Sequence, residues 1–399
     1  MAASAPLPYP AFDVDNHYYE AEDAFTRHID QAMARRAVQW VELRGRKRIL
    51  VAGKLDRFLP NPSFDPVTTP GALEAYFRGE NRDGKTMAEL FAGKIEPIRP
   101  EYRDREARLA CMEKQGLEAI VLFPTLGCGI EQPLRHDAEA THAALDAFNR
   151  WLDEDWGFNH RDKIYAVPML TLMDVDTAVK QLEWVLARGA RMVHLRPAPV
   201  PKGDRSVSPG DPTHDSFWAR VNEAGIPVAF HAGDSGYGRY VAAWEGPRPM
   251  EGFRGGNTFA MATLPGRAVL DTMAALICHG VFDRFPNVRV ASIENGGFWV
   301  PWLFKNLRKA HGQMPSLFGE DPIESFRRHV YVAPYFEDDA RELADLIGVA
   351  HVLFGSDFPH AEGLPAPLDY LDDLRDFSGD EIRRIMRDNQ HELLTPRPL

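Results

Sequence analysis

The chain has 399 residues, 44% of them hydrophobic, and a formal net charge of −12 at pH 7. This length and composition allow a large buried core, and the acidic balance argues against binding to nucleic acid or to an anionic membrane. Cys111, Cys128 and Cys278 are too few and too widely spaced for a disulfide framework. With no apolar run of membrane-spanning length and no signal-peptide pattern, we expect a cytoplasmic protein that acts on a small molecule.

Eight short apolar segments are typical of β-strands, and several are apolar almost without interruption, as in a parallel sheet buried on both faces. In chain order they are residues 11–17, 117–125, 164–170, 190–197, 226–233, 288–295, 329–336 and 351–357. Apolar residues at helical spacing lie between most of them, over 100–115, 136–159, 174–189, 265–279, 338–348 and 378–394. The alternation predicts an α/β fold in which residues 1–399 form a single (β/α)8 TIM barrel, with an open doubly wound sheet as the alternative.

Two segments are too long to be simple connections between a strand and a helix. Residues 37–99, rich in arginine, proline and glycine, are predicted to be an insertion after the first strand. Residues 232–264, rich in glycine, are predicted to be a long loop after the fifth strand. Both follow the C-terminal end of a strand, so we expect both to overhang the face of the barrel where catalytic sites form.

The C-terminal ends of several predicted strands carry side chains that bind metal ions. Asp15 and His17 lie two residues apart at the end of the first strand, which places them on one face. His231 ends the fifth strand, Glu294 the sixth and Asp357 the eighth. Because the first and last strands of a closed barrel are neighbours, we expect these five side chains to meet around one metal ion.

Four further residues are candidates for substrate binding. His194 and Arg196 share one face of the fourth strand, and the Arg196 guanidinium is a candidate clamp for a carboxylate or an oxyanion. The alternative for Arg196 is packing at the rim of the barrel. Arg254 lies in the glycine-rich loop, and His360 follows the last strand, at the expected mouth of the site.

The closing motif Gly355-Ser356-Asp357-Phe358-Pro359, together with Asp15, His17 and His231, resembles the amidohydrolase-related (amidohydrolase 2) family of metal-dependent TIM barrels. The resemblance is to the branch that includes aminocarboxymuconate-semialdehyde decarboxylase. It implies that His17, His231 and Asp357 are metal ligands, that Asp15 is a substituted ligand in a histidine position, and that the protein is a homo-oligomer, namely a dimer. Glu294 stands where those decarboxylases have a catalytic histidine.

The expected cofactor is one divalent metal ion, zinc or manganese. Imidazole suits zinc, while the carboxylate of Asp15 makes manganese a stronger competitor. Such an ion lowers the pKa of a bound water, and Asp357 is the expected acceptor of its proton. Glu294 is either a further ligand or a general acid/base that also contacts the substrate.

These residues leave three functions open. The leading prediction is hydrolysis of an amide, a lactone or a related bond in a small organic molecule. The main alternative is nonoxidative decarboxylation of an aromatic or unsaturated carboxylic acid, for which Glu294 in place of histidine is a departure. A third possibility is a barrel that binds its ligand without turnover, which a metal content near zero would favour.

Overall fold

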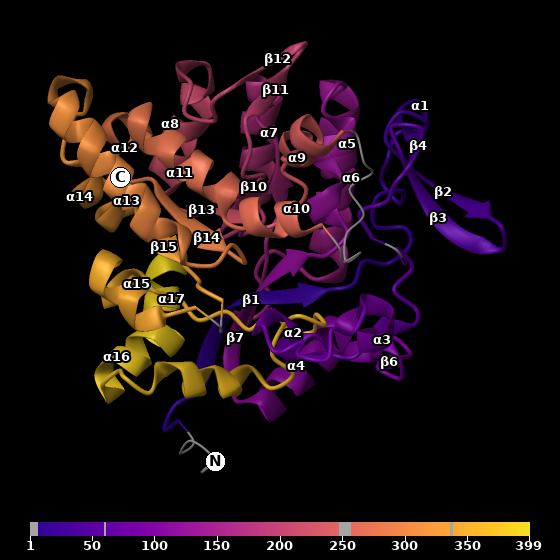
Figure 1. The fold of residues 1–399 in the computed structure, drawn as a ribbon. Coiled ribbons are helices and arrows are strands. Elements are labelled where there is room, and N and C mark those ends of the chain that lie inside the picture. The colour runs from indigo at the N-terminus through magenta and orange to yellow at the C-terminus, as the bar shows by residue number, and fades with distance from the viewer. Residues whose placement is uncertain (1–6, 60, 247–256, 336–337) are drawn as a thin grey trace.

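Parallel strands form a closed ring at the centre of the molecule (Figure 1). The computed structural model describes residues 7–59, 61–246, 257–335 and 338–399. One sheet has the order β1-β7-β8 and the other β15-β14-β13-β10-β9, while the bridges Asn16–Phe358 and Val332–Val352 join β1 and β15 through the last segment. The strands are β1 (Ala11–Tyr18), β7 (Leu117–Pro124), β8 (Ile164–Ala166), β9 (Met169–Leu170), β10 (Val193–Leu195), β13 (Pro227–His231), β14 (Arg289–Ile293) and β15 (Val330–Val332).

The strands follow the predicted order along the chain, but most are shorter than predicted. The predicted strand 164–170 is divided into β8 and β9, because Pro168 lacks the N–H that a continuous ladder needs. The predicted strand 351–357 contributes the Val332–Val352 bridge and no regular strand, and the Asn16–Phe358 bridge follows directly after it. These two segments complete an eight-membered (β/α) ring, as expected for a TIM barrel.

Helices surround the ring (Figure 1). Asp104, Asp137 and Asp174 begin three of them, and each carboxylate accepts a hydrogen bond from an N–H of the first helical turn. The sequence did not predict α8, α13 or α14. These helices are α4 (Arg105–Gln115), α6 (Ala138–Asp155), α7 (Val175–Leu186), α8 (Asp215–Ala224), α11 (Arg267–Cys278), α13 (Trp299–Gln313), α14 (Pro322–His329), α15 (Ala340–Ile347), α16 (Gly379–Arg383) and α17 (Asn389–Leu394).

Shorter elements complete the connections between strands and helices. A hairpin of β11 (Val200–Lys202) and β12 (Arg205–Val207) follows β10, and a π-helical turn over Arg384–Asp388 joins α16 to α17. The remaining short helices are α5 (Glu131–Leu134), α9 (Gly238–Glu245), α10 (Thr258–Thr263) and α12 (Val281–Arg284).

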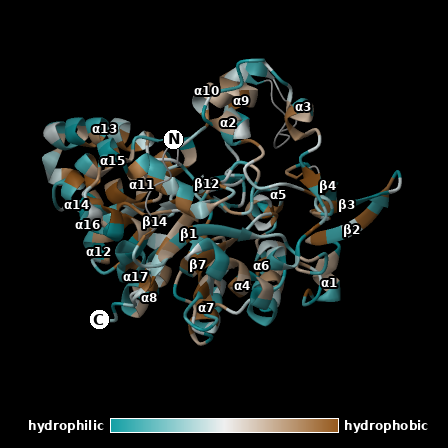
Figure 2. Cartoon of the chain, turned by 90° about the horizontal axis from the view of Figure 1, so that it is seen from below, coloured by the Kyte–Doolittle hydropathy of each residue, from teal (hydrophilic) through white to brown (hydrophobic). Residues whose placement is uncertain are grey.

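The segment between β1 and α4 builds its own small elements outside the ring. Arg44 and Gly45 both have positive φ, which suits the tight turn between β2 and β3. Figure 2 shows this hairpin extending away from the rest of the chain. The elements are α1 (Gln31–Ala34), β2 (Val38–Leu43), β3 (Arg46–Val51), β4 (Lys54–Leu55), β5 (Val67–Thr68), α2 (Glu74–Phe77), α3 (Met87–Phe91) and β6 (Ile95–Glu96).

One stretch, Thr258–Cys278, is long and apolar enough to cross a membrane by length and composition. The structure divides it into α10 and α11 at Gly266, whose φ is +65°. Neither helix alone has the length of a membrane span. Half of α11, including Met273 and Leu276, is buried against the core.

The interior of the ring is filled by a compact apolar cluster. Alternate residues of each strand point inward, and large side chains such as Phe123 pack beside small ones such as Ala229 and Ala291. This cluster closes the ring below the strand ends, so polar side chains at those ends face the opposite, open side. Its members are Phe12, Val14, Ala119, Val121, Phe123, Val167, Met192, Ala229, Ala291, Ile293, Tyr331, Ala333, Leu353, Leu393 and Leu394.

Candidate metal centre

Side chains from the ends of four ring segments meet at one point. His17 Nε2 lies 3.3 Å from Asp15 Oδ1 and 3.2 Å from Asp357 Oδ1. His231 Nε2 lies 3.3 Å from the same Asp15 oxygen and 3.2 Å from Glu294 Oε2. The backbone joins the two ends of the chain here, since Asp357 N donates to the Asp15 carbonyl at 2.7 Å. The structure therefore brings together all five side chains that the sequence placed at strand ends.

The backbone is strained at two of these residues. Glu294 and Asp357 have φ values of +53° and +57°, a region that residues other than glycine rarely adopt. Gly355 lies so close to Asp15 that a Cβ added at position 355 would come within 2.5 Å of the Asp15 Cβ. The Glu294 carbonyl accepts a hydrogen bond from the Tyr335 hydroxyl at 2.8 Å, which holds the strained turn. Such conformations persist where the surrounding structure fixes them, and they cluster at functional sites.

A divalent ion fits these residues. His231 Nδ1 lies 2.8 Å from the Ala232 carbonyl, which leaves the Nε2 lone pair of the neutral ring directed at the carboxylates. Among the described residues, His17 Nδ1 and Nε2 and Asp357 Oδ1 are buried without a hydrogen-bond partner. Buried polar atoms without partners are rare unless an ion or water satisfies them. Imidazole nitrogens with carboxylate oxygens form a donor set that suits both zinc and manganese.

The unshielded charges of this site shift the pKa values of its members. Burial raises the pKa of Asp15, but the hydrogen bonds and charges of His17 and His231 outweigh burial and lower it. Burial lowers the pKa of His231, yet Glu294 and Asp15 raise it to about 9. Burial and the neighbouring Asp357 charge raise the pKa of Glu294, and burial with nearby acidic charges raises that of Asp357. Several carboxylates therefore lie close together in a site that is shielded from water.

A layer of hydrogen bonds supports the site from below. The fully buried Asp13 carboxylate accepts from Ser356 N and Asp15 N, each at 3.0 Å, and from Asn16 Nδ2 at 2.8 Å. It therefore ties the first strand to the closing motif. The Arg108 guanidinium donates to Asn16 Oδ1 and to the His17 carbonyl, and so fixes the same strand from outside.

A cavity of about 620 Å³ opens above the site. Its floor includes His17, His231, Glu294 and His360. Much of its wall is apolar and comes from the segment between β1 and α4, in agreement with the prediction that residues 37–99 overhang this face of the barrel. These wall residues are Phe58, Leu59, Phe64, Pro66, Val67, Phe91 and Ile95.

The four predicted substrate-binding residues have different environments. His360 lines the cavity and stacks on the His17 ring at a centroid distance of 3.9 Å. His194 is buried beside His231, with ring centroids 6.4 Å apart, and is not among the described residues that line the cavity. Arg254 lies outside the described residues.

Arg196 differs from the prediction. Its guanidinium donates to Gln132 Oε1, and its Nε lies 3.5 Å from Glu131 Oε1. These partners on α5 hold it toward a separate small cavity, away from the metal centre. The predicted clamp for a substrate carboxylate is therefore wrong for Arg196 in this conformation.

One acidic residue of the site was missed from the sequence. Glu362 lines the cavity, and one of its oxygens lies within 4.8 Å of ligand atoms of Glu294, Asp357 and His360. The sequence contains one indication of this position, because Glu362 lies two residues after His360 in the segment that follows the last strand. Loops that follow barrel strands can therefore bring a carboxylate to the site from beyond the strand end.

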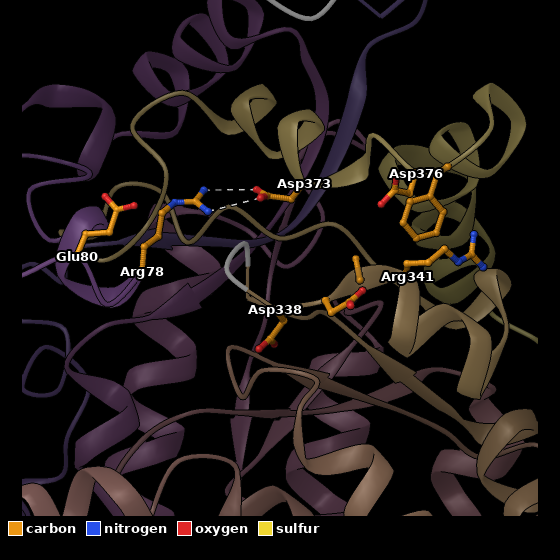
Figure 3. Close-up of a pocket in the computed structure, with 9 residues that line it drawn as sticks. Arg78, Glu80, Asp338, Arg341, Asp373 and Asp376 are labelled. Carbon is orange, nitrogen blue, oxygen red and sulfur yellow. Dashed lines mark hydrogen bonds and ion pairs between the residues drawn. The ribbon is translucent and has the colours of Figure 1, made fainter. Parts of the chain in front are cut away.

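A second acidic pocket, of about 290 Å³, lies elsewhere on the molecule (Figure 3). Arg78 of its rim lies 3.4 Å from Asp373 Oδ2, as the dashed lines show. Arg341 pairs with Asp345 at 2.8 Å and with Glu381 at 3.1 Å. No histidine is among the described residues that line this pocket. Of the acids that line the pocket, Asp373 therefore has a guanidinium partner, whereas Asp15 and Asp357 of the metal centre lie against imidazoles.

Comparison with known proteins gives consistent results. The sequence model of a family described as amidohydrolase matches residues 104–394. A crystal structure of an amidohydrolase from Mycobacterium avium subsp. paratuberculosis K-10 is 48% identical and has a TM-score of 0.92, covering 98% of this chain and 100% of that one.

Two more distant structures share the fold. A dihydroxybenzoic acid decarboxylase from Polaromonas sp. JS666, solved with manganese and 2-nitroresorcinol, is 14% identical, covers 97% of each chain and has a TM-score of 0.58. A 5-carboxyvanillate decarboxylase from Sphingomonas paucimobilis is 17% identical, covers 82% of this chain and 95% of that one, and has a TM-score of 0.55.

Proposed function

This chain belongs to the amidohydrolase family and is a metal-dependent enzyme of that family, and we propose that it hydrolyses a small uncharged organic substrate. The scissile bond is that of an amide, a lactone or a related carbonyl compound. Membership of an enzyme family removes the alternative of a barrel that binds without turnover. The finer assignment rests on the chemistry of the cavity.

The observation that carries this proposal is the combination of an acidic floor with an apolar wall. Asp15, Glu294, Asp357 and Glu362 supply carboxylates at or beside the metal centre, and Phe58, Phe64 and other apolar side chains form the wall. Among the described residues, no lysine or arginine lines this cavity. A free carboxylic acid would meet the repulsion of these acids without a cationic side chain to hold it, whereas a neutral carbonyl compound would not.

Asp15, His17, His231 and Asp357 are the residues that would hold the metal ion. When bound, a divalent ion polarises a carbonyl oxygen and lowers the pKa of water toward neutrality. The Asn16, Asp13 and Arg108 hydrogen bonds fix the strand that carries two of these ligands, so the donor atoms are already in place.

Asp357 and Glu294 are suited to move protons in this reaction. Asp357 Oδ1 lies 3.2 Å from His17 Nε2 at the metal centre, so its carboxylate is placed to accept a proton from the attacking water. Glu294 Oε2 lies 3.2 Å from His231 Nε2, and the side chain lines the cavity, so it is placed to donate a proton to the substrate oxygen or to the leaving heteroatom. His360 contacts Asp357 Oδ1 at 2.7 Å and restricts its orientation.

The experiment is an assay of the manganese-loaded enzyme against neutral lactones and amides and, in parallel, against aromatic carboxylic acids. We expect hydrolysis of neutral compounds, and a fall in kcat of about 10²- to 10⁴-fold in Asp357→Asn at saturating manganese. Asp376→Asn, in the second acidic pocket, is the matched control and should keep the wild-type rate. Stoichiometric CO2 release without hydrolysis of any neutral compound would replace this proposal by decarboxylation.

Three further statements about the protein stay predictions. They are the organisation of residues 1–399 as a single domain, the assembly into a dimer and the cytoplasmic location. Zinc and manganese both fit the donor atoms, and manganese is the ion to test first because two of the four proposed ligands, Asp15 and Asp357, are carboxylates.

A further inference from the structure

The cavity above the metal centre leads from a buried floor to the solvent. His17 and His231 of the floor are 0% and 1% exposed, whereas Ile95 of the wall is 59% exposed. Phe64 and Val67, which line the same wall, are buried. An apolar lining that continues from a buried site to an exposed residue is typical of a groove that binds an apolar ligand.

The inserted segment that supplies this wall is hydrogen-bonded to the barrel at both sides of the cavity. The Arg103 guanidinium donates to the Ser63 carbonyl at 2.7 Å and to the Glu20 carbonyl at 3.0 Å, and so joins the insertion to the residues after the first strand. Leu73 N donates to the Ala361 carbonyl at 2.7 Å, in the segment after the last strand. Within the insertion, β5 pairs with β6. The wall is therefore already formed without a ligand.

Two aromatic rings of the wall pack directly on barrel segments. The Phe64 ring lies 4.8 Å from the Tyr19 ring, centroid to centroid. Phe58 lies so close to Gly129 that a Cβ added at position 129 would overlap its ring. Both rings therefore keep apolar surface beside the cavity, and an apolar group that covers this surface releases the water in contact with it.

Several polar side chains that interrupt this lining are already bound to the protein. Asn61, Thr125 and Cys128 each donate to a backbone carbonyl, at 2.9, 2.8 and 3.2 Å respectively. A polar group placed against the wall would lose hydrogen bonds to water and gain few in return. The wall therefore favours the apolar part of a substrate.

We propose that the substrate carries a linear alkyl group, which lies along this apolar wall while the neutral carbonyl lies at the metal centre. The cavity of about 620 Å³ is in the range of pockets that enclose larger organic ligands, and so has room for more than the carbonyl group. A linear group fits better than a compact ring, because the lining continues to the exposed Ile95. The inference rests on the proposed hydrolysis and adds the class of compound, which is an alkyl-substituted lactone or a long-chain amide.

The test is the dependence of binding on alkyl length in the full-length, manganese-loaded protein. Methyl propyl, methyl pentyl and methyl heptyl ketone are suitable probes, because they are neutral carbonyl compounds without a bond to hydrolyse. Titration calorimetry should show a Kd that falls about two- to fourfold with each added methylene group. In parallel, kcat/KM for γ-lactones with alkyl substituents of the same lengths should rise by a similar factor.

A matched pair of variants locates the alkyl group. Ile95→Asp places a charge in the outer wall and should weaken the binding of methyl heptyl ketone about tenfold. Leu55→Asp is the control, because Leu55 is a 37% exposed residue of the same insertion and is not among the described residues that line the cavity. It should keep the wild-type Kd. Circular dichroism establishes that both variants are folded.

Equal affinities for the three ketones, or methyl phenyl ketone bound as tightly as methyl heptyl ketone, would overturn the inference. Unchanged binding in Ile95→Asp, or an equal loss in Leu55→Asp, would also overturn it, because the alkyl group would then lie elsewhere. Lactone hydrolysis that does not depend on alkyl length would contradict the inference and leave the proposed function standing. Binding that depends on alkyl length, without hydrolysis of any lactone or amide, would instead overturn the proposed function and leave the apolar binding site standing.

Discussion

Acidic side chains gather in two pockets of this molecule, and their surroundings differ. At the metal centre, Asp15 and Asp357 lie against imidazole nitrogens at 3.2–3.3 Å. In the second pocket, Asp373 lies against the guanidinium of Arg78 (Figure 3). A guanidinium is permanently charged and cannot bind a metal ion, while an imidazole that gives up its proton offers a lone pair to a metal ion beside the carboxylate. The comparison teaches that the partner, rather than the number of acids, marks a metal site.

The largest expected effect is a loss of Mn²⁺ affinity at the metal centre. His231→Ala removes a ligand, so we expect Mn²⁺ to bind at least about 100-fold more weakly, a loss at the upper end of that seen when supporting residues are removed. Titration calorimetry measures the affinity directly. His351→Ala, a histidine whose ring packs on Tyr331 at 4.6 Å, is the matched control. Unchanged Mn²⁺ affinity in His231→Ala would contradict the assignment of this pocket.

Mn²⁺ bound at the metal centre should also raise the free energy of unfolding, and the second pocket should add nothing to this gain. At a free Mn²⁺ concentration 100 times the Kd, binding to the folded state adds about 2.7 kcal/mol to the free energy of unfolding. Thermal melts with and without Mn²⁺ should show this gain in the wild type and in Arg78→Ala. The gain should be absent in His231→Ala. A larger gain in Arg78→Ala, which frees the Asp373 carboxylate, would place the ion in the second pocket.

In the second pocket, we expect the ion pair between Arg78 and Asp373 to contribute little to the free energy of unfolding. The side chains of Arg78 and Asp373 are 28% and 21% exposed, and their closest atoms are 3.4 Å apart. Partly exposed pairs of this kind contribute about 0.2–1 kcal/mol. A double-mutant cycle of Arg78→Ala and Asp373→Asn, followed by urea unfolding, measures the coupling energy. A coupling energy several times larger would mean that this pocket is as tightly constrained as the metal centre.

The smallest expected effect is on how the free energy of unfolding depends on pH, and it concerns Asp338. This residue lines the second pocket and accepts hydrogen bonds from Gly297 N at 2.6 Å and Tyr335 N at 3.1 Å. Burial raises the pKa of Asp338 above its ordinary value of 3.8. Between these two values the folded state holds a proton that the unfolded state has lost. The stability contributed by this group is therefore complete below pH 3.8 and is lost as the pH rises through the folded-state pKa.

Asn at position 338 does not titrate, so Asp338→Asn isolates this contribution. The wild type should have its greatest advantage over the variant near pH 4, and the difference should shrink as the pH rises. Urea unfolding over a pH series gives the difference in free energy at each pH. A difference that is constant, or that grows with pH, would show that the N–H donors outweigh burial at Asp338.

The sequence was enough to predict the ring and the five side chains at its strand ends. Strands buried on both faces have a distinctive apolar pattern, and ring closure then requires Asp15 and Asp357 to be neighbours. The residues at which the strands begin and end were less predictable. The local proline that splits β8 from β9 was visible, but the loss of regular pairing around residue 353 depends on neighbouring strands.

The sequence indicated that residues 37–99 overhang the site, but the particular residues of the cavity wall and the direction of single side chains were beyond sequence reasoning. Apolar residues such as Phe64 and Phe91 lie in irregular segments, where no periodicity indicates what they face. Arg196 lies at the end of a strand, as the candidate metal ligands do, yet its guanidinium contacts Gln132 and Glu131 of another element. Glu362 returns to the site only because of the path of the loop after Asp357.

The most direct test of the metal centre is a crystal structure of the manganese-loaded protein with anomalous diffraction data. We predict an anomalous peak about 2.0–2.3 Å from His17 Nε2 and His231 Nε2, and within bonding distance of Asp15 and Asp357. The second pocket should show no peak. A peak confined to the pocket of Arg78 and Asp373, or density for water alone between His17 and His231, would contradict the account.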